Sequence, residues 1–381
     1  MEADWSQLPR ELLQLISQKL DNSELYLLRF RSVCSTWCSS VPNYRCNNHS
    51  FLKQIPQFPN EIKPPTTSNR PAPTSNYVRC LSKQNIFLIK PPNQQTPLRP
   101  WLIRIGPDLD GITCLWHPFH LYQKYPLRFA HDLIDFNQLP VLHLGHMFYI
   151  HGPDSDQTTR LHYGKVVVAT SDVGQPLALL TYDSSLVPKI FRCGDNSWTS
   201  IPTMSRSLWG DICLFKGRPC VADKDGRTLM IGPDSTVHLL ANPVFGGNVK
   251  HLVESECELL LVDCHGIDTS NADKDIRFDV FRLDENEKKW VKLANIGDIV
   301  LFVGGDCSFS AKASDLQVRS GNSVVYNISA DFSNLDKIQS GMRIFRLDQG
   351  RVSKLSGYHN YIRLFWPPPE WIVRLHSHPE Y

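Results

Sequence analysis

Glycine is absent from the start of the chain, because all 21 glycines of the 381 residues lie between Gly106 and Gly357. Tight turns favour glycine, which reaches positive φ angles without steric cost. The sequence therefore divides into two regimes of backbone, with the boundary early in the chain. A helical pattern and a proline-rich stretch come first, and short strands separated by turn residues follow.

Further absences narrow the class of protein. No eighteen apolar residues run together, which argues against a membrane-spanning helix, and Glu2 and Asp4 stand where a secretory signal has basic residues. The 40 basic and 38 acidic residues give a net charge of +2, which argues against nonspecific binding to nucleic acid. The eleven cysteines include no Cys-x-x-Cys pair. We expect an intracellular protein with free thiols and no structural disulfide.

Signatures of catalysis are absent as well. The sequence has no glycine-flanked serine elbow, no phosphate-binding loop and no dinucleotide-binding fingerprint. We therefore expect a protein that is not an enzyme and that needs no cofactor. The alternative is a channel site assembled from distant residues of a β domain.

Two motifs resemble metal-binding sequences, but we predict no metal ion at either of them. Asp223-Lys224-Asp225-Gly226 fails as an EF-hand loop, because Val221 and Gly232 would then stand where ligands belong, and a hairpin turn explains it better. Histidines spaced as His-x-x-His could share zinc only if strands aligned them, and no cysteine pair completes a structural site. The histidines concerned are His117, His120, His143, His146 and His151.

Helical periodicity marks the first forty residues. The apolar residues that recur at helical spacing after Pro9 are Leu12, Leu15, Ile16 and Leu20. Asp21 to Ser23 offers N-cap side chains for a second short helix, and Val33 with Trp37 indicates a third. A unit this small cannot bury so many apolar side chains alone, so we expect a partner surface. Packing on the C-terminal domain is the alternative.

The order of these residues is the informative feature. Leu8-Pro9-x-Glu11-Leu12 is followed by Ile16, Leu20, Leu25 and Leu28, and then by Val33-Cys34-x-x-Trp37. This order resembles the F-box family, although Phe30-Arg31-Ser32 departs from many members. The resemblance implies binding to a Skp-type adaptor and, through it, to cullin and RING subunits. The adaptor-binding residues that it implies are Leu8, Pro9, Leu12, Ile16, Leu20, Leu25, Leu28, Val33 and Trp37.

Residues 43–77 carry six prolines among serines, threonines and asparagines. Such a composition favours extended chain and is typical of a linker between domains. Phe51, Ile55 and Phe58 could dock part of this linker on a domain, and the sequence leaves both arrangements open.

Beyond residue 77 the chain has apolar runs of strand length. They are Ile86–Ile89, Val166–Ala169, Leu177–Tyr182, Ile212–Phe215, Leu259–Val262, Phe278–Leu283 and Leu301–Val303. Asp-Gly, Gly-Asp and Gly-Pro turns separate them, and no amphipathic helix of useful length intervenes. We therefore expect antiparallel sheets in an all-β domain.

A loose repeat within this region indicates a β-propeller. Trp101, Trp198 and Trp290 are separated by 97 and 92 residues, and half that spacing is one blade. Asp211–Ala241 and Val249–Leu293 each indicate four short strands. The length predicts six or seven blades, with Trp198 and Trp290 in blade cores rather than stacked on a ligand. A pair of β-sandwiches or an irregular barrel is the alternative.

Several motifs of this region form a second resemblance. They are Gly194-Asp195-x-x-Trp198, Val280-Phe281-Arg282-Leu283-Asp284, Trp290, Ile296-Gly297-Asp298, Leu301–Gly304, Cys307–Ser310 and Pro367-Pro368-Pro369-Glu370-Trp371. Together they resemble the plant F-box family with a C-terminal domain of unknown function, which is kelch-like and of propeller type. That family implies a substrate domain without chemistry of its own, and the nucleus as one working compartment beside the cytoplasm.

The predicted fold class is α+β multidomain: a three-helix F-box at residues 5–41, a proline-rich linker at 42–76 and an all-β propeller-like domain at 77–372. The resemblances imply the substrate-recognition subunit of an SCF-type (Skp-cullin-F-box) E3 ubiquitin ligase, with an unknown protein as its target and neither nucleic acid nor membrane as a partner. The alternatives are a propeller interaction protein outside a ligase and a propeller enzyme with a channel site.

Overall fold

The protein is described here from a computed structural model, which covers part of each predicted domain. The described residues are 5, 8–19, 29–30, 33–40, 80–91, 98–108, 113–119, 124–128, 139–151, 165–170, 176–182, 187–192, 195–201, 204, 210–232, 236–266, 276–305, 307–327 and 335–374. Within these ranges no helix has both the length and the apolar character needed to cross a membrane.

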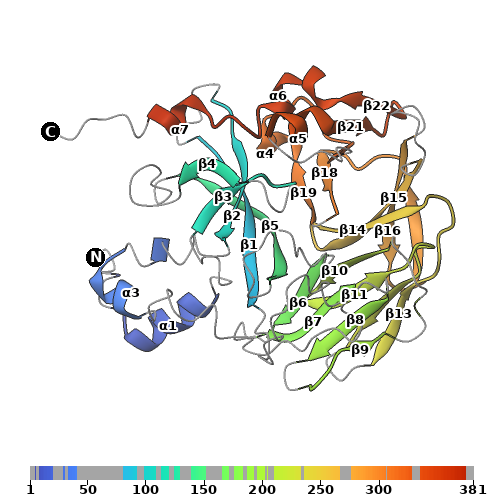
Figure 1. The fold of residues 1–381 in the computed structure, drawn as a ribbon, viewed down its shortest axis with the longest axis horizontal. Helices are drawn as coiled ribbons and strands as arrows, with labels where there is room; N and C mark the ends of the chain where they lie inside the picture. The colour runs from blue at the N-terminus through green and yellow to red at the C-terminus, as the bar shows by residue number, and fades with distance from the viewer. Residues whose placement is uncertain are drawn as a thin grey trace, which may run out of the picture.

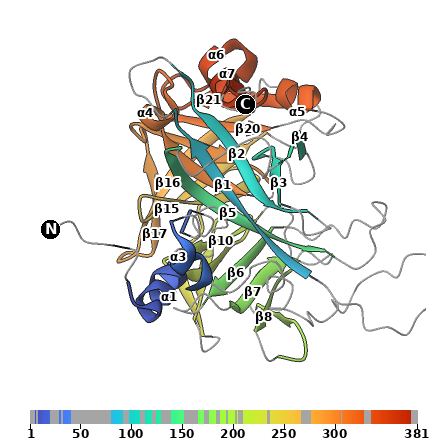
Figure 2. The same cartoon turned by 90° about the vertical axis from the view of Figure 1, so that its left-hand side faces the viewer.

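Two helices of the N-terminal region lie beside each other (Figure 1, Figure 2). They are α1 (Arg10–Lys19) and α3 (Ser35–Ser40). Pro9 stands just before α1, where its missing N–H costs nothing, and its carbonyl accepts the first helical hydrogen bond, from Leu13 N at 3.1 Å. The helix predicted from Pro9 to Leu20 is thus confirmed. The predicted second helix, with Leu25 and Leu28, lies outside the described residues, so the count of three helices stays a prediction.

The described strands form four sheets. The first has nine strands in the order β4-β3-β2-β1-β5-β6-β7-β8-β9. Their bounds are β1 (Cys80–Ile89), β2 (Trp101–Pro107), β3 (Thr113–Trp116), β4 (Lys124–Arg128), β5 (Val141–His151), β6 (Val166–Thr170), β7 (Pro176–Tyr182), β8 (Pro188–Arg192) and β9 (Thr199–Ser200).

Two four-stranded sheets follow in simple chain order, and both were predicted from the sequence. The first comprises β10 (Asp211–Phe215), β11 (Arg218–Ala222), β12 (Thr228–Ile231) and β13 (Val237–Ala241). The second comprises β14 (Val249–Ser255), β15 (Glu258–His265), β16 (Arg277–Asp284) and β17 (Lys289–Leu293). All neighbours in these sheets are antiparallel, as the short turns between apolar runs require.

The last sheet has the order β19-β18-β20-β21-β22 and corrects the expectation of purely antiparallel pairing. Its strands are β18 (Ile299–Val303), β19 (Ser308–Lys312), β20 (Ser323–Asn327), β21 (Met342–Arg346) and β22 (Arg351–Lys354). β18 and β20 pair in parallel, because β19 and the short helix α4 (Ala313–Leu316) carry the chain back between them. The remaining helices are α5 (Leu335–Gly341), η3 (Leu355–Gly357), α6 (His359–Ile362) and α7 (Glu370–Arg374).

The strand groups follow one another around the domain (Figure 1), and buried side-chain clusters join each group to the next. One cluster joins β6–β8 to β10–β12, a second joins β10–β13 to β14–β17, and a third joins β14–β16 to β18–β21. A fourth cluster packs the last sheet on the first, through residues such as Phe302 and Leu102. The sheets therefore close into a ring, which is the arrangement of a propeller-type domain.

The predicted count of six or seven blades is not confirmed. The nine-stranded sheet consists of two arms, β1–β5 and β6–β9, which one register pair, Phe148 with Val166, joins. With the other three sheets, the described residues thus show five groups of four or five strands. The groups differ in length, and the first alone extends from residue 80 to residue 151.

The chain after the last strand holds the first sheet in place. Leu102 N donates to the carbonyl of Leu364 at 2.7 Å, and Trp371 Nε1 donates to the carbonyl of Arg99 at 2.9 Å. Arg99 Nη2 in turn donates to the carbonyl of Pro367 at 2.7 Å. The Pro367–Trp371 motif therefore fastens the segment after the last strand to the start of β2.

Candidate functional site

Helix α1 has an inner face that fixes it to its neighbours. Leu13 is 0% exposed and forms a small core with Phe30, which is also buried. Leu8 and Trp37 pack against this core, and the rings of Phe30 and Trp37 lie 4.6 Å apart. Trp37 Nε1 also donates to the carbonyl of Trp5 at 2.9 Å. The inner face thus positions the helix.

The other face of α1 carries apolar side chains that nothing covers within the described residues. Leu12, Leu15 and Ile16, called here the exposed stripe, are spaced so that they share one side of the helix. Leu15 is 55% exposed, and Val33 and Trp5 are exposed as well. Exposed apolar residues that cluster in this way mark an interaction surface.

The structure divides the predicted adaptor-binding residues into two kinds. Those exposed to solvent are Pro9, Leu12, Ile16 and Val33, and those packed on the inner core are Leu8 and Trp37. Leu20, Leu25 and Leu28 lie outside the residues whose side chains are described. Sequence reasoning did not single out Leu13, the inner anchor, or assign Trp5 and Leu15 to the exposed surface. Helical spacing is the signal for Leu13, since it lies roughly 100° around the helix from Leu12, on the side that carries the buried Ser17.

A contact among the described residues ties the helical region to the β domain. The Arg29 guanidinium donates to the carbonyl of Leu139, just before β5. A carbonyl held by a charged donor gives a stronger hydrogen bond than a neutral pair. The contact therefore helps to set the direction in which the helices present the exposed stripe.

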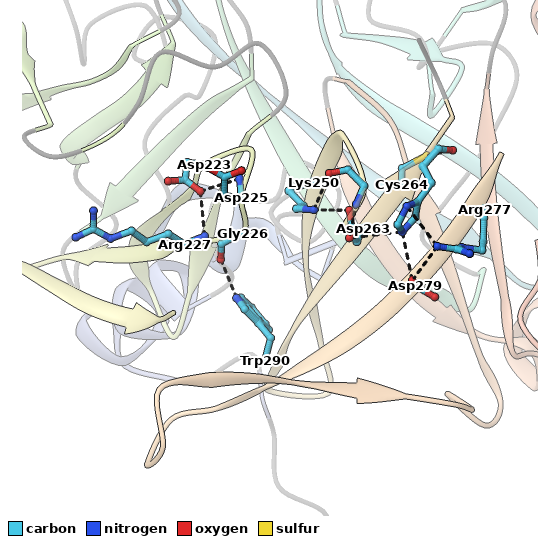
Figure 3. A network of polar contacts seen from close by, with 12 residues as sticks. Asp223, Asp225, Gly226, Arg227, Lys250, Asp263, Cys264, Arg277, Asp279 and Trp290 are labelled. Carbon is cyan, nitrogen blue, oxygen red and sulfur yellow. Dashed lines mark hydrogen bonds and ion pairs between the residues drawn. The ribbon is translucent and has the colours of Figure 1, made fainter. Parts of the chain in front are cut away.

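The β domain holds a buried ion pair in its third sheet (Figure 3). Lys250 of β14 and Asp263 of β15 are register partners, and their side chains are fully buried. Gly247 completes the network, because its N–H donates to Asp263 Oδ2 at 2.9 Å and its carbonyl accepts from Lys250 Nζ at 3.0 Å. A Cβ at Gly247 would lie 2.3 Å from Asp263 Oδ1, so the approach requires glycine. Both charges are compensated, as a structural pair requires.

Asp279 of β16 extends this network toward the surface (Figure 3). Its Oδ1 accepts from Lys292 Nζ at 2.9 Å, and His265 Nε2 lies 3.2 Å from its Oδ2. Partial burial by itself would raise the pKa of Asp279, but the hydrogen bond from Lys292 and the charges of Lys292 and Arg277 lower this pKa below its ordinary value. Asp279 therefore supplies a fixed negative charge at neutral pH.

The Asp223–Arg227 turn is the predicted hairpin turn, between β11 and β12. Asp223 Oδ1 accepts hydrogen bonds from the N–H groups of Asp225 and Arg227, at 2.9 and 3.0 Å, and Gly226 has φ +80°. Trp290 Nε1 donates to the carbonyl of Gly226 at 2.9 Å and is buried (Figure 3). The predicted packing role of Trp290 is confirmed, since it locks one sheet to the turn of its neighbour. Trp198 is buried as well.

The loop between β13 and β14 presents one aromatic side chain to solvent. Phe245 is 79% exposed. The loop around it is fixed, because Val244 N donates to the carbonyl of Asp225 at 2.7 Å and Asn248 N donates to that of Cys264 at 2.9 Å. The two hydrogen bonds therefore fix the backbone on both sides of Phe245.

The histidine pairs do not assemble a metal site in the described part of the chain. His143 and His146 lie on β5 with nearly parallel rings whose centroids are 6.3 Å apart, and burial together with the charge of Lys83 lowers the pKa of His146. His117 is buried among aromatic rings. No group of three His, Cys, Asp or Glu side chains in the described ranges is placed to hold a metal ion. His120 and the side chain of His151 lie outside those ranges.

Comparison with models of protein families finds two matches. Residues 5–49 match the F-box domain, and residues 66–350 match the KIB1-4 beta-propeller. The chain belongs to the KIB1-4 beta-propeller family. Both resemblances seen in the sequence are thereby confirmed: the KIB1-4 propeller follows an F-box, as the order of the N-terminal apolar residues indicated. The predicted domain boundaries at residues 41 and 76 stay a prediction.

Curated relatives from Arabidopsis thaliana match this KIB1-4 chain over nearly its whole length. F-box protein SKIP23 is 33% identical, over 97% of this chain and 96% of the relative. F-box protein At2g17036 is 29% identical, over 99% and 96%. The putative F-box/kelch-repeat protein At5g24040 is 24% identical, over 97% and 98%. The relatives therefore share both domains.

The two domains define a general role. An F-box implies binding to a Skp-type adaptor, and members of the F-box protein family are generally adaptor subunits rather than enzymes. An F-box joined to a propeller-type domain supports substrate recognition within SCF ligases in general.

Proposed function

We propose that this protein is the substrate-recognition subunit of an SCF-type ubiquitin ligase. Its F-box binds a Skp-type adaptor, which links it to cullin and RING subunits, and its β domain captures a protein target. Its contribution to catalysis is proximity, since a captured target lies near a ubiquitin-charged enzyme held by the other subunits. The observation that carries the proposal is the exposed stripe on α1.

The stripe is suited to a protein partner for energetic reasons. Full burial of an exposed leucine or isoleucine side chain contributes about 1.5–3 kcal/mol, and Leu12, Leu15 and Ile16 are 46%, 55% and 37% exposed, so a partner gains roughly half of that from each. Leu13 fixes the orientation of these side chains, because its burial against Phe30 sets the rotation of the helix about its axis. A partner therefore meets a face that is already oriented, which lowers the entropic cost of binding.

The predicted adaptor-binding residues take distinct roles in this proposal. Direct contact falls to the exposed residues Pro9, Leu12, Ile16 and Val33, together with Trp5 and Leu15. Leu8 and Trp37 act as positioning residues, because they pack on the inner core. Leu20, Leu25 and Leu28 remain in the proposed set from the family resemblance.

The β domain supplies the surface for the target. Loops on a rigid scaffold commonly carry binding residues, and Phe245 lies on such a loop. We infer that Phe245 contacts the target. Once a target is identified, Phe245→Ala should weaken its binding at least tenfold without changing adaptor binding, and equal target affinity for both forms would show that another surface is used.

We propose that the protein works in the nucleus, the cytoplasm or both, where a cullin scaffold can assemble with it. Fluorescence of a fusion to the full chain would place it, and exclusive residence in a secretory compartment would contradict the proposal.

The direct test is binding of the full chain to a purified Skp-type adaptor. Leu12→Asp with Leu15→Asp places two charges in the exposed stripe and should reduce the affinity at least a hundredfold. Gln14→Asp is the matched control, since it adds a charge to an exposed polar position of the same helix. Circular dichroism must show that all three forms are folded.

The outcome separates the classes of function. Binding by wild type and by the Gln14→Asp control, with loss in the stripe variant, supports the ligase subunit. No binding by folded wild type overturns it and directs attention to a propeller interaction protein or to a channel enzyme.

A further inference from the structure

The hairpin of β10 and β11 places two thiols opposite each other. Cys213 and Cys220 are direct register partners across the two strands. The strands are joined by Lys216 and Gly217, whose φ angles of +51° and +74° are those of a two-residue type I′ turn. The pair that flanks such a turn is hydrogen-bonded, and alternation along the ladder makes the Cys213–Cys220 pair hydrogen-bonded too.

This position allows a disulfide, but only a strained one. Opposite residues of a hydrogen-bonded pair have Cα atoms about 5.5 Å apart, within the range of about 4.4–6.8 Å that a disulfide spans. Their Cβ atoms lie about 4.5–5.5 Å apart, whereas a disulfide prefers about 3.5–4.5 Å. The strands must therefore approach by about 1 Å, and strained disulfides are the readily reduced ones.

The two cysteines share one buried cluster in the reduced protein. The Cys220 thiol donates to the carbonyl of Arg218 at 3.7 Å. Both residues are buried, although Cys213 is 8% exposed and Cys220 is 0% exposed. The hydrogen bond to Cys220 and burial together raise the pKa of Cys213 well above its ordinary value. The raised pKa makes reaction slow in the closed hairpin.

We propose that Cys213 and Cys220 form a reversible oxidation site, with a small-molecule disulfide such as oxidised glutathione as the oxidant. The more accessible Cys213 thiolate attacks one sulfur of the oxidant, which forms a mixed disulfide and releases one thiol. The Cys220 thiolate then attacks the Cys213 sulfur, forms the cross-strand bond and releases the second thiol. The two released glutathione thiolates take up the two protons that the protein thiols lose, and the oxidant takes up two electrons.

Oxidation acts on the packing between two sheets. Cys213 and Cys220 belong to the cluster that packs β10–β13 on β14–β17, together with Leu283 and Trp290. The tip of the hairpin also holds the neighbouring sheet, since Lys216 Nζ lies 2.6 Å from Glu285 Oε1. Drawing the two strands together therefore changes how the neighbouring sheets pack, and reduction reverses the change.

The test treats the reduced full chain with glutathione buffers of increasing oxidised fraction, under native conditions. The protein is then alkylated and digested with trypsin, which cleaves after Lys216, between the two cysteines. The expected result is a Cys213–Cys220 cross-linked peptide pair that dithiothreitol removes. Cys257 is exposed and serves as an internal control. A glutathione adduct on Cys257 shows that the oxidant is active.

Two variants sharpen the result. Cys257→Ala should leave the cross-link unchanged, and Cys213→Ala should leave Cys220 reduced, because Cys220 is the less accessible thiol. Glutathione on Cys257 without a Cys213–Cys220 link in wild type would overturn the proposal. So would a link that forms only after urea unfolding. Neither of these two readouts depends on the folding of a variant.

Discussion

The N-terminal helices and the β domain differ in how far their apolar side chains are exposed to solvent. In the described helices, the exposed stripe, Trp5 and Val33 face solvent, whereas Leu13 and Phe30 are buried. In the described β domain, Phe245 is the one large apolar side chain exposed to a similar extent, and buried clusters join each strand group to the next. The β domain thus completes its own core, whereas the helices need a partner to cover theirs.

The two regions also differ in how they treat charge. The β domain buries Lys250 with Asp263 and compensates both charges through Gly247. The helices bury no charged side chain among the described residues. Removing one partner of a buried ion pair is strongly destabilising. The fold of the β domain therefore depends on polar contacts as well as on apolar packing.

The largest expected effect comes from breaking the buried pair. Asp263→Ala leaves Lys250 buried without a counter-charge, which should lower the free energy of unfolding of the β domain by about 3–5 kcal/mol. Urea unfolding followed by tryptophan fluorescence measures it. Lys216→Ala is the control at an exposed pair and should change the free energy by less than about 1 kcal/mol. Equal effects would show that Asp263 is not essential to the core.

The next effect separates the two faces of α1. Leu13→Ala empties the inner core and should destabilise the helical region by about 2–5 kcal/mol, whereas Leu15→Ala should cost less than about 0.5 kcal/mol. Hydrogen exchange of the amides of residues 10–19 reports the difference. If Leu15→Ala opened the helix as much as Leu13→Ala, the exposed stripe would be part of a core.

The smallest effect concerns the pH dependence of Asp279. Its pKa is lowered from the ordinary value of 3.8, so its ionised form stabilises the folded state at neutral pH. Asp279→Asn should therefore lower stability by up to about 1 kcal/mol at pH 7. The difference between the two proteins should vanish as the pH falls through the folded-state pKa, below 3.8. A difference that grew on acidification would contradict this sign.

Local signals predicted the elements that depend on nearby residues. The two four-stranded sheets were predictable because their apolar runs are short, and in the first of them the turns carry Lys216-Gly217 and Asp225-Gly226. Helix α1 was predictable because Pro9, Glu11 and the apolar spacing all agree. The joining of β5 to β6 and the parallel pairing of β18 with β20 were not predictable, because they depend on distant segments.

Contacts between residues that are distant in the sequence could not be predicted either. Lys250 and Asp263 lie opposite each other only because of the register of β14 and β15. The sequence gives one hint of this pair. Asp263 directly follows the apolar run Leu259–Val262, so its carboxylate is expected to be buried and to need a partner. For α1, spacing separates Leu13 from the exposed stripe, but only packing against Phe30 shows which face is inside.

The most direct test of the central claim is hydrogen exchange of the full chain with and without a purified Skp-type adaptor. The adaptor should protect amides of residues 8–19 and 33–40, with the largest change around Leu12 and Ile16, and should leave the β10–β17 sheets unchanged. Protection confined to the β domain, or a stable complex that leaves α1 unprotected, would contradict the claim that the exposed stripe binds the adaptor.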